Sequence, residues 1–145
     1  MTLRYRPATV EDAPLLGLWN ARLYEDERNP GWKSLDEFIS RMRGWLAGDE
    51  HHGIVFETEE GPVGYALYRQ EPEGLYLRHF YIDRPFRRQG LGRRCARLLL
   101  GEALPLGQPV ALDVLETNPG GHAFWRAMGF RLYSHRLVMS AQERG

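Results

Sequence analysis

The sequence predicts a single mixed α/β domain, in which a mostly antiparallel sheet is flanked by about four helices. Alternating apolar runs joined by glycine- and proline-containing turns predict adjacent antiparallel strands in the middle of the chain. Apolar residues at helical spacing before and after them predict flanking helices, one of which joins two parallel strands. The length of 145 residues, with 43% apolar and 26% charged residues, suits one globular domain over 1–145.

Cap and turn signals set the boundaries of the predicted elements. Ser34, with Glu37 three residues later, is typical of a capping box, and proline–glycine clusters mark the turns. The order β-α-α-β-β-β-α-β-α-β(β), with six or seven strands, comprises a strand at Leu3–Pro7, a helix from Thr9 to about Asp26, a helix from Ser34 to Gly48, strands at His51–Glu57, Val63–Gln70 and Leu75–Ile82, a helix at Leu91–Leu100, a strand at Val110–Glu116, a helix at His122–Met128 and one or two strands within Phe130–Met139. Ala141–Gly145 is expected to be a frayed tail.

Positive charge is concentrated in one segment. The 19 basic and 19 acidic residues cancel, which argues against a nucleic-acid partner. Between Arg78 and Arg97, however, there are seven arginines and one acid, Asp83. Such a segment in a neutral chain indicates a localised anionic ligand. The alternative is that Arg93, Arg94 and Arg97 solvate a helix face.

Several classes of site are disfavoured by the composition. The single cysteine, Cys95, allows neither a disulfide nor a cysteine-based metal site in a monomer, and its apolar neighbours predict that it is buried. His51 and His52 lack the spacing of metal ligands, so no metal is predicted. The start of the chain does not read as a signal peptide, and no apolar run approaches the ~20 residues of a membrane span. A cytoplasmic protein without a membrane partner is the expectation.

The strongest chemical signal is a strand, a glycine-rich turn and a helix start within 75–100. Gly90 and Gly92 let backbone N–H groups approach a ligand closely. The following helix adds its free N–H groups and positive dipole end. Arg87, Arg88 and Arg93 can add charge-assisted hydrogen bonds. The pattern predicts a phosphate or pyrophosphate site.

Two segments carry a resemblance to a known family. Arg87, Gly90 and Gly92 match the Arg/Gln-x-x-Gly-x-Gly/Ala motif that binds acyl-coenzyme A (CoA) in the GNAT-type N-acetyltransferases. Asn118, followed by the segment 123–130, resembles the family's Asn…Ala…Tyr…Gly-Phe segment. The opening RPATVEDA and the strand order also fit, so the resemblance covers nearly the whole chain. It implies the GNAT fold, with strands that splay apart to form the CoA cleft.

The resemblance also implies an activity. Acetyl-CoA would donate an acetyl group to a primary amine by direct attack in a ternary complex, and the acceptor would be a small-molecule or protein amine. The residues that the resemblance places against the cofactor are Tyr81, Ile82, Arg87, Arg88, Gln89, Gly90, Leu91, Gly92, Arg93, Asn118, Phe124 and Trp125. A homodimer through strands near the C-terminus is also expected.

The acid and base have several candidates. Trp125 stands where many relatives have a tyrosine that protonates the leaving thiolate, and indole cannot serve as an acid near neutral pH. Water, Tyr133 or Tyr81 would have to replace it. For the base, His79 is the first candidate because its ordinary pKa suits the task, and Glu116 is the second.

The acceptor side is less defined. Glu25 and Glu27 are interpreted as attracting a cationic amine or as a solvated helix end, and Trp32 as lining the acceptor pocket. The missing tyrosine also leaves an alternative function, a non-catalytic acyl-CoA-binding sensor or regulatory module.

Overall fold

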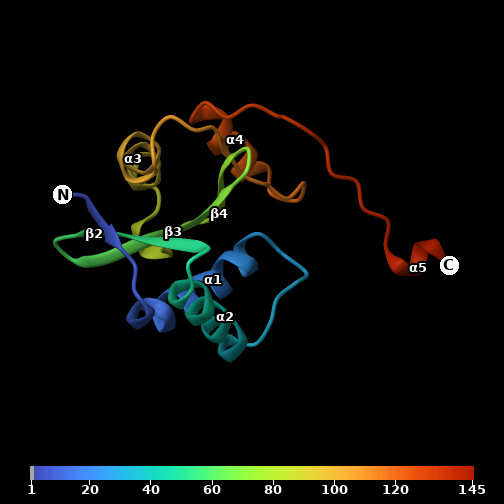
Figure 1. The fold of residues 1–145 in the computed structure, drawn as a ribbon, viewed down its shortest axis with the longest axis horizontal. Helices are drawn as coiled ribbons and strands as arrows, with labels where there is room; N and C mark the ends of the chain where they lie inside the picture. The colour runs from blue at the N-terminus through green and yellow to red at the C-terminus, as the bar shows by residue number, and fades with distance from the viewer. Residues whose placement is uncertain (1) are drawn as a thin grey trace.

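The computed structural model, which describes residues 2–145, is organised around one sheet of five strands (Figure 1). The strands lie in sequence order across the sheet; β4 and β5 are parallel, and the other neighbouring pairs are antiparallel. They are β1 (Arg4–Pro7), β2 (His51–Thr58), β3 (Gly61–Glu71), β4 (Gly74–Ile82) and β5 (Val110–Ala111). The mixed, mostly antiparallel sheet is confirmed, with five strands instead of six or seven.

Helices cover both faces of this sheet. α1 (Ala13–Asp26) and α2 (Leu35–Ala47) pack together on one face, and α3 (Leu91–Leu98) lies on the other, in the predicted crossover between β4 and β5 (Figure 1). The remaining elements are the 3-10 turns η1 (Val10–Asp12) and η2 (Arg84–Phe86), the π-helical turn η3 (Leu99–Ala103), α4 (Pro119–Ala127) and α5 (Ala141–Arg144). Within residues 2–145, no helix is long and apolar enough to cross a membrane.

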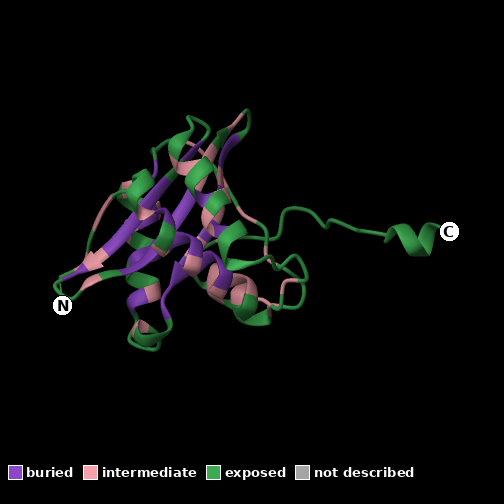
Figure 2. Cartoon of the chain, turned by 90° about the horizontal axis from the view of Figure 1, so that it is seen from below, coloured by how far each residue is buried: buried purple, intermediate pink, exposed green. Residues whose placement is uncertain are grey.

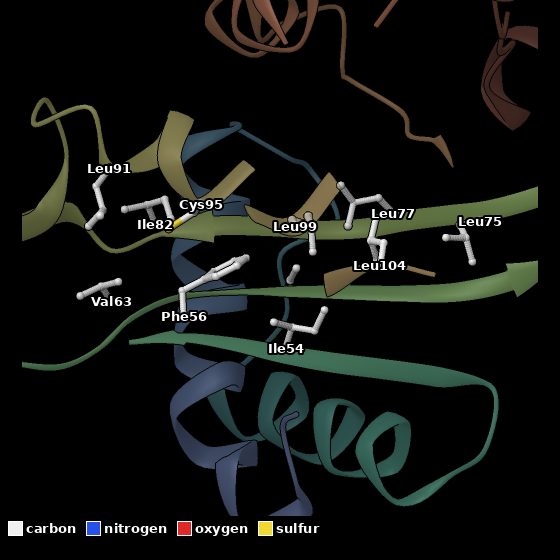
Figure 3. Packing of buried hydrophobic residues seen from close by; sticks show 11 residues of the cluster. Ile54, Phe56, Val63, Leu75, Leu77, Ile82, Leu91, Cys95, Leu99 and Leu104 are labelled. Carbon is white, nitrogen blue, oxygen red and sulfur yellow. The ribbon is translucent and has the colours of Figure 1, made fainter. Parts of the chain in front are cut away.

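One apolar cluster lies on each face of the sheet. The cluster against α3 includes Leu77, Leu99 and the fully buried Cys95 (Figure 3). The cluster against α1 and α2 includes Trp19 and Tyr65. Burying one side chain of this size stabilises the fold by roughly 1.5–3 kcal/mol. The strands are mostly buried and the outer faces of the helices exposed (Figure 2). Burial raises the pKa of Cys95 to about 12, so its thiol stays protonated at neutral pH.

The predicted capping signals are present at both early helices. The Glu37 backbone N–H donates to the Ser34 hydroxyl at 3.2 Å, at the start of α2. The Thr9 backbone N–H donates to an Asp12 carboxylate oxygen at 2.8 Å, although the turn it caps is the 3-10 turn η1 and not the first turn of α1. These bonds satisfy N–H groups that a helix leaves free at its start.

The predicted strand Val110–Glu116 is wrong beyond its first two residues. Only those two residues pair with β4, and the following ones leave the sheet without regular structure. Leu112 and Val114 are only partly buried. The Tyr76 hydroxyl donates to an Asp113 carboxylate oxygen at 2.6 Å where the segment departs. Alternating polarity predicts an extended chain but not how long the neighbouring strand stays within hydrogen-bonding distance.

The predicted strands within Phe130–Met139 are also wrong. This C-terminal segment, residues 130–139, runs away from the body of the molecule and pairs with no strand of the described chain (Figure 1). The expected frayed tail is instead the short helix α5, capped by a hydrogen bond from the Glu143 N–H to the Ser140 hydroxyl at 3.1 Å. The segment exposes five large apolar side chains: Leu132, Tyr133, Leu137, Val138 and Met139. The sequence of this segment favours an extended backbone, but it does not specify a neighbouring strand with which that backbone could pair.

Candidate functional site

The side of β4 that faces β5 is unpaired over most of its length. β5 pairs only with Leu75 and Tyr76, and we call the residues that follow, 77–82, the open edge of β4. A β-bulge lies at its start, where Arg78 is the extra residue relative to β3. At its end, the Asp83 N–H donates to β3, so the backbone groups of the preceding residue point to the open side. An extended ligand can pair there as an added strand would.

The open edge leads into a turn that suits an anion. Arg88 and Gly90 both have positive φ angles, 63° and 73°, and Gly90 is the N-cap of α3. A Cβ added at Gly90 would meet nothing within 4 Å, so this position is open. The amides of residues 91–93 lie in the first turn of α3, where no intrahelical acceptor exists. These N–H groups and the positive helix end form an anion-binding surface.

Asp83 holds the start of this turn. Its carboxylate accepts hydrogen bonds from the Tyr81 hydroxyl at 2.9 Å, the Arg84 backbone N–H at 3.0 Å and Arg22 at 3.0 Å. Burial acts to raise the pKa of Asp83, but these donors outweigh burial and lower it. Burial and then the bond to Asp83 raise the pKa of Tyr81. The Tyr81 hydroxyl is therefore protonated at neutral pH and committed to Asp83.

Arg87, the arginine of the predicted motif, is anchored to the protein itself. Its Nε donates to the Ile82 carbonyl at 2.8 Å, and its Nη2 lies 2.6 Å from an Asp26 carboxylate oxygen. Its guanidinium also lies 5.1 Å from the Tyr81 ring centre. Arg84 reaches the same Asp26 carboxylate at 3.0 Å. Arg87 thus ties the end of α1 to the turn.

The other side chains that are predicted to bind the cofactor in this turn make few contacts with the protein. Arg88 and Arg93 are exposed and form no ion pair within residues 2–145. The Gln89 amide approaches the Pro85 carbonyl at 3.5 Å, which is a weak contact. In this turn the backbone N–H groups are fixed by the fold, whereas these side chains make few contacts.

Asn118 starts α4. Its Oδ1 accepts a hydrogen bond from the Gly121 N–H at 3.0 Å, so α4 begins at Pro119, three residues before the predicted His122. Asn118, which is predicted to contact the cofactor, caps a helix through its carbonyl oxygen. Its amide NH2 group has no partner among the described residues.

Phe124 and Trp125 place α4 against the end of β4. The Phe124 ring centre lies 5.9 Å from that of Phe80, and Trp125 lies 5.1 Å from Phe80 and 5.3 Å from Phe130. A Cβ on Gly92 would lie 3.6 Å from the Phe124 ring, so the start of α3 sits beside α4. The structure thus brings Gly92, Phe124 and Trp125 together. Trp125 is one member of an aromatic cluster.

His79 lies within a directed chain of hydrogen bonds. Arg41 Nη2 donates to Asn20 Oδ1 at 3.0 Å, and Asn20 Nδ2 lies 3.4 Å from His79 Nε2. His79 Nδ1 lies 3.0 Å from the Tyr65 hydroxyl. Because arginine only donates, the Asn20 amide donates to His79 in turn, and the proton of the neutral ring lies on Nδ1. Both ring nitrogens are therefore engaged.

The environment of His79 keeps it neutral. The side chain is 6% exposed, and burial lowers its pKa well below the ordinary value, with the charges of Arg78 and Arg41 acting in the same direction. A neutral imidazole is able to accept a proton, but a base of low pKa does so weakly.

The remaining predicted catalytic residues lie apart from His79. Glu116 is exposed in the turn before α4, and Tyr133 is fully exposed on the C-terminal segment. Within residues 2–145, neither forms a hydrogen bond or ion pair with His79 or with the turn before α3. Glu25 lies 3.7 Å from Arg84. Glu27 is partly buried, and burial and then the charge of Asp26 raise its pKa.

The comparison with known sequences decides the family. A model of the acetyltransferase (GNAT) family matches residues 19–130. The chain belongs to the GNAT acetyltransferase family. It is therefore an acyltransferase of a family that uses acetyl-CoA as its acetyl donor. No curated protein matches the sequence.

Solved structures share this GNAT fold. An acetyltransferase from Thermus thermophilus is 24% identical with a TM-score of 0.74, over 90% of this chain and 88% of that one. A predicted acetyltransferase from Clostridium acetobutylicum, solved with acetyl-CoA, is 18% identical with a TM-score of 0.72, over 98% of each chain. A ribosomal-protein-alanine N-acetyltransferase from Brucella melitensis is 14% identical with a TM-score of 0.74, over 97% and 99%. At these identities the likeness concerns the fold.

Beside the open edge of this GNAT domain lie residues that the sequence analysis missed. Arg41 on α2 and Arg78 on β4 both stack on Trp45, with guanidinium carbons 4.5 and 4.7 Å from its ring centre. Arg41 falls within the apolar stripe that includes Phe38, Met42 and Trp45, and a charge inside such a stripe is the signal that would have marked it. Trp32, predicted to line the acceptor pocket, is 51% exposed.

Proposed function

We propose that the chain transfers an acetyl group from acetyl-CoA to a primary amine, by direct attack in a ternary complex. The observation that carries this proposal is the continuity of the open edge of β4 with the turn and the N-terminus of α3. An unpaired strand edge suits the amide-bearing arm of CoA, and free amides at a helix start suit its pyrophosphate. Family membership supplies the acetyl donor.

The donor contacts divide between the two sides of the open edge. The end of β4 at Tyr81 and Ile82 would lie along the arm, with Ile82 as the residue whose backbone points to the open side. The amides of residues 88–93 would hold the pyrophosphate. Phe124, Trp125 and the free NH2 group of Asn118 would line the opposite side. Arg87 acts in this proposal as a brace, because its Nε and Nη2 already bond to Ile82 and Asp26.

The transfer makes one bond and breaks one. The neutral amine nitrogen attacks the thioester carbon, the C–N bond forms, the C–S bond breaks and the thiolate of CoA leaves. The Ile82 N–H points to the open side, and we assign it to stabilise the negative charge on the thioester oxygen during attack. The amine loses one proton to a base or to water.

His79 is the proposed base, with Glu116 second and Tyr133 as the proposed acid. For His79 to act, its Nε2 must exchange the Asn20 amide for the substrate proton. A thiolate also leaves without an acid, which accommodates Trp125. Separate His79→Gln and Glu116→Gln variants test the assignment. A ~100-fold or greater fall in kcat is expected on loss of a base, and an unchanged kcat would remove that residue from the mechanism.

The activity itself is tested by mixing acetyl-CoA with a panel of primary amines and measuring thiol release and the acetylated product. The expected result is amine-dependent thiol release with an equal yield of acetylated amine. Thiol release without acetylated amine would reflect hydrolysis only and would contradict the proposal.

The second candidate is a non-catalytic acyl-CoA-binding sensor. Trp125 favours it, because its aromatic cluster contains no proton donor where many relatives have a tyrosine. Calorimetric binding of acetyl-CoA without turnover of any small amine or protein lysine would favour the sensor over the enzyme.

We also infer that the chain forms a homodimer through its C-terminal segment. Two of the exposed apolar side chains, Leu137 and Val138, are 92% and 81% exposed, more than a monomer in water readily maintains. The segment carries Arg131 and Arg136 and no acid, whereas residues 112–116, which have left the sheet, carry Asp113 and Glu116 and no base. The charges favour pairing of one copy's C-terminal segment with residues 112–116 of the other.

Light scattering at increasing concentration tests the dimer. The full chain should show twice the chain mass, and Leu137→Asp should shift it to the monomer, whereas Arg144→Gln on α5 should not. A full chain that stays monomeric at high micromolar concentration would contradict the inference and would mean that the segment folds back on its own copy.

A further inference from the structure

Two arginines at the start of the open edge have no acidic partner. Arg41 and Arg78 both stack on Trp45, and neither forms an ion pair within residues 2–145. The arginines that do form one are Arg4, Arg6, Arg22, Arg69, Arg84 and Arg87. Stacking orients a guanidinium but leaves its hydrogen-bonding edge available to a carboxylate.

Arg41 is held in place by neutral groups. Its Nη2 donates to Asn20 Oδ1 at 3.0 Å and to the Tyr24 hydroxyl at 3.3 Å, and its guanidinium lies 5.6 Å from the Phe38 ring centre. Its Nε is buried and has no acceptor among the described residues. A buried donor of a charged group that lacks an acceptor is destabilising. An anionic ligand beside Arg41 would offset part of that cost.

Arg78 connects this charge to the proposed transfer site. It is the bulge residue at the start of the open edge, one residue before His79. A strand rises ~3.3 Å per residue, so about 13 Å separate Arg78 from Ile82, where the thioester is proposed to lie. A linear chain with an amine at one end and an anion at the other matches that separation once the length of the arginine side chain is included.

The charges of Arg41 and Arg78 also act on His79, the proposed base. Burial is the larger cause of the lowered pKa of His79, and Arg78 and Arg41 are the next two. A second positive charge on an acceptor would be repelled at this end of the open edge, whereas a carboxylate would be attracted.

We propose that Arg41 and Arg78 form an anion subsite of the acceptor site, and that the preferred acceptor is an aliphatic primary amine carrying a carboxylate at its far end. This inference rests on the proposed acetyl transfer. The carboxylate belongs either to a free amino acid or to the C-terminus of a peptide, and the acceptors in the test separate these sources.

The test compares matched acceptors. One pair is 6-aminohexanoate and 6-aminohexanamide, and the other is triglycine and its C-terminal amide. In at least one of the two pairs, the wild type should acetylate the acceptor that carries the carboxylate with a kcat/KM ~10-fold or more above that of the matching amide. A charge-assisted hydrogen bond to the carboxylate implies a difference of this size. In Arg78→Gln this ratio should fall to about 1, and Arg78→Lys should retain part of it. Arg43→Gln, an exposed arginine of α2 without an ion pair, is the control and should keep the wild-type ratio.

A binding measurement separates this inference from the proposed function. Calorimetry with 6-acetamidohexanoate and its amide reports on the subsite without turnover. Equal kcat/KM for carboxylates and amides, with turnover intact, would overturn the subsite and leave acetyl transfer standing. The opposite result is also possible: the wild type binds 6-acetamidohexanoate more tightly than its amide, Arg78→Gln loses this preference, and no amine is turned over. That result would overturn the proposed function and leave the subsite standing. Equal binding of acid and amide by the wild type would overturn the subsite in either case.

Discussion

The two ends of the open edge of β4 use arginine in opposite ways. At the end beside α3, Arg84 and Arg87 are bonded to Asp26, and Arg22 is bonded to Asp83. At the other end, Arg41 and Arg78 stack on aromatic rings and have no acid within residues 2–145. The first group holds the turn before α3 in place, and the second has no acid to neutralise its charge within residues 2–145. Arginine-rich sequence therefore does not by itself locate the phosphate contacts.

The largest expected effect tests the backbone amides at the α3 end. Gly90→Asp should weaken CoA binding roughly 100-fold, because a carboxylate a few ångströms from the pyrophosphate repels it. Aspartate and asparagine tolerate the left-handed backbone of Gly90 (φ 73°) better than most residues but remain strained there, so both variants should lower the Tm by a similar small amount. Calorimetric titration with CoA measures the effect. Gly90→Asn has the same shape without the charge, and an equal loss in both variants would exclude charge repulsion.

The next effect tests the buried, neutral state of His79, which lies beside Arg41 and Arg78 at the other end of the open edge. His79 has a lowered pKa when folded, so the unfolded chain binds its proton first as the pH falls below about 6.5. Stability present above that pH is then lost as the pH falls towards the folded pKa, by up to about 1.4 kcal/mol per pH unit. Urea unfolding of His79→Gln should show a flatter pH dependence than the wild type. Tyr65→Phe keeps the buried imidazole and should keep the slope; identical slopes in wild type and His79→Gln would contradict the buried neutral histidine.

A smaller effect asks whether Arg87 is a brace or a ligand. Arg87→Gln and Asp26→Asn both break this partly exposed ion pair, and Asp26→Asn also loses the pair with Arg84. Each should therefore cost about 0.5–1 kcal/mol of stability and weaken CoA binding by a factor of roughly 2–5. Denaturant unfolding and CoA titration measure both quantities. If Arg87→Gln lost far more CoA affinity than Asp26→Asn, Arg87 would contact the pyrophosphate directly, and the contrast between the two ends would fail.

The smallest effect concerns the opposite side of the open edge. Trp125→Phe should lower kcat by far less than the ~100-fold that loss of a general acid costs, because indole donates no useful proton. The smaller ring should destabilise the aromatic cluster by roughly 1–2 kcal/mol. Steady-state kinetics beside thermal unfolding separate the two effects, with Leu106→Ala as an exposed control outside the site. A large fall in kcat at unchanged stability would give Trp125 a direct role in transfer.

Much of the fold was predictable because it depends on local patterns. The capping box at Ser34, the hairpin of β2 and β3 and the burial of Cys95 follow from residues a few positions apart or from their own apolar neighbours. The turn before α3 was predictable for the same reason, since Gly90 adopts the left-handed conformation that its residue type allows. Residues 130–139 were not, because an extended segment needs a neighbour that its own sequence does not specify.

The sequence by itself determined the family, the order of the elements up to α3 and the position of the glycine-containing turn before α3. Only the tertiary structure decided which hydrogen bonds and ion pairs the side chains of the site form. Asp26, distant from Arg87 in sequence, pairs with that predicted phosphate ligand, and Asn20 and Tyr65 engage both nitrogens of His79. Ion pairs and hydrogen bonds form between whichever groups folding brings within about 3 Å. A sequence motif therefore predicts the backbone conformation of a site better than it predicts which groups its charged side chains contact.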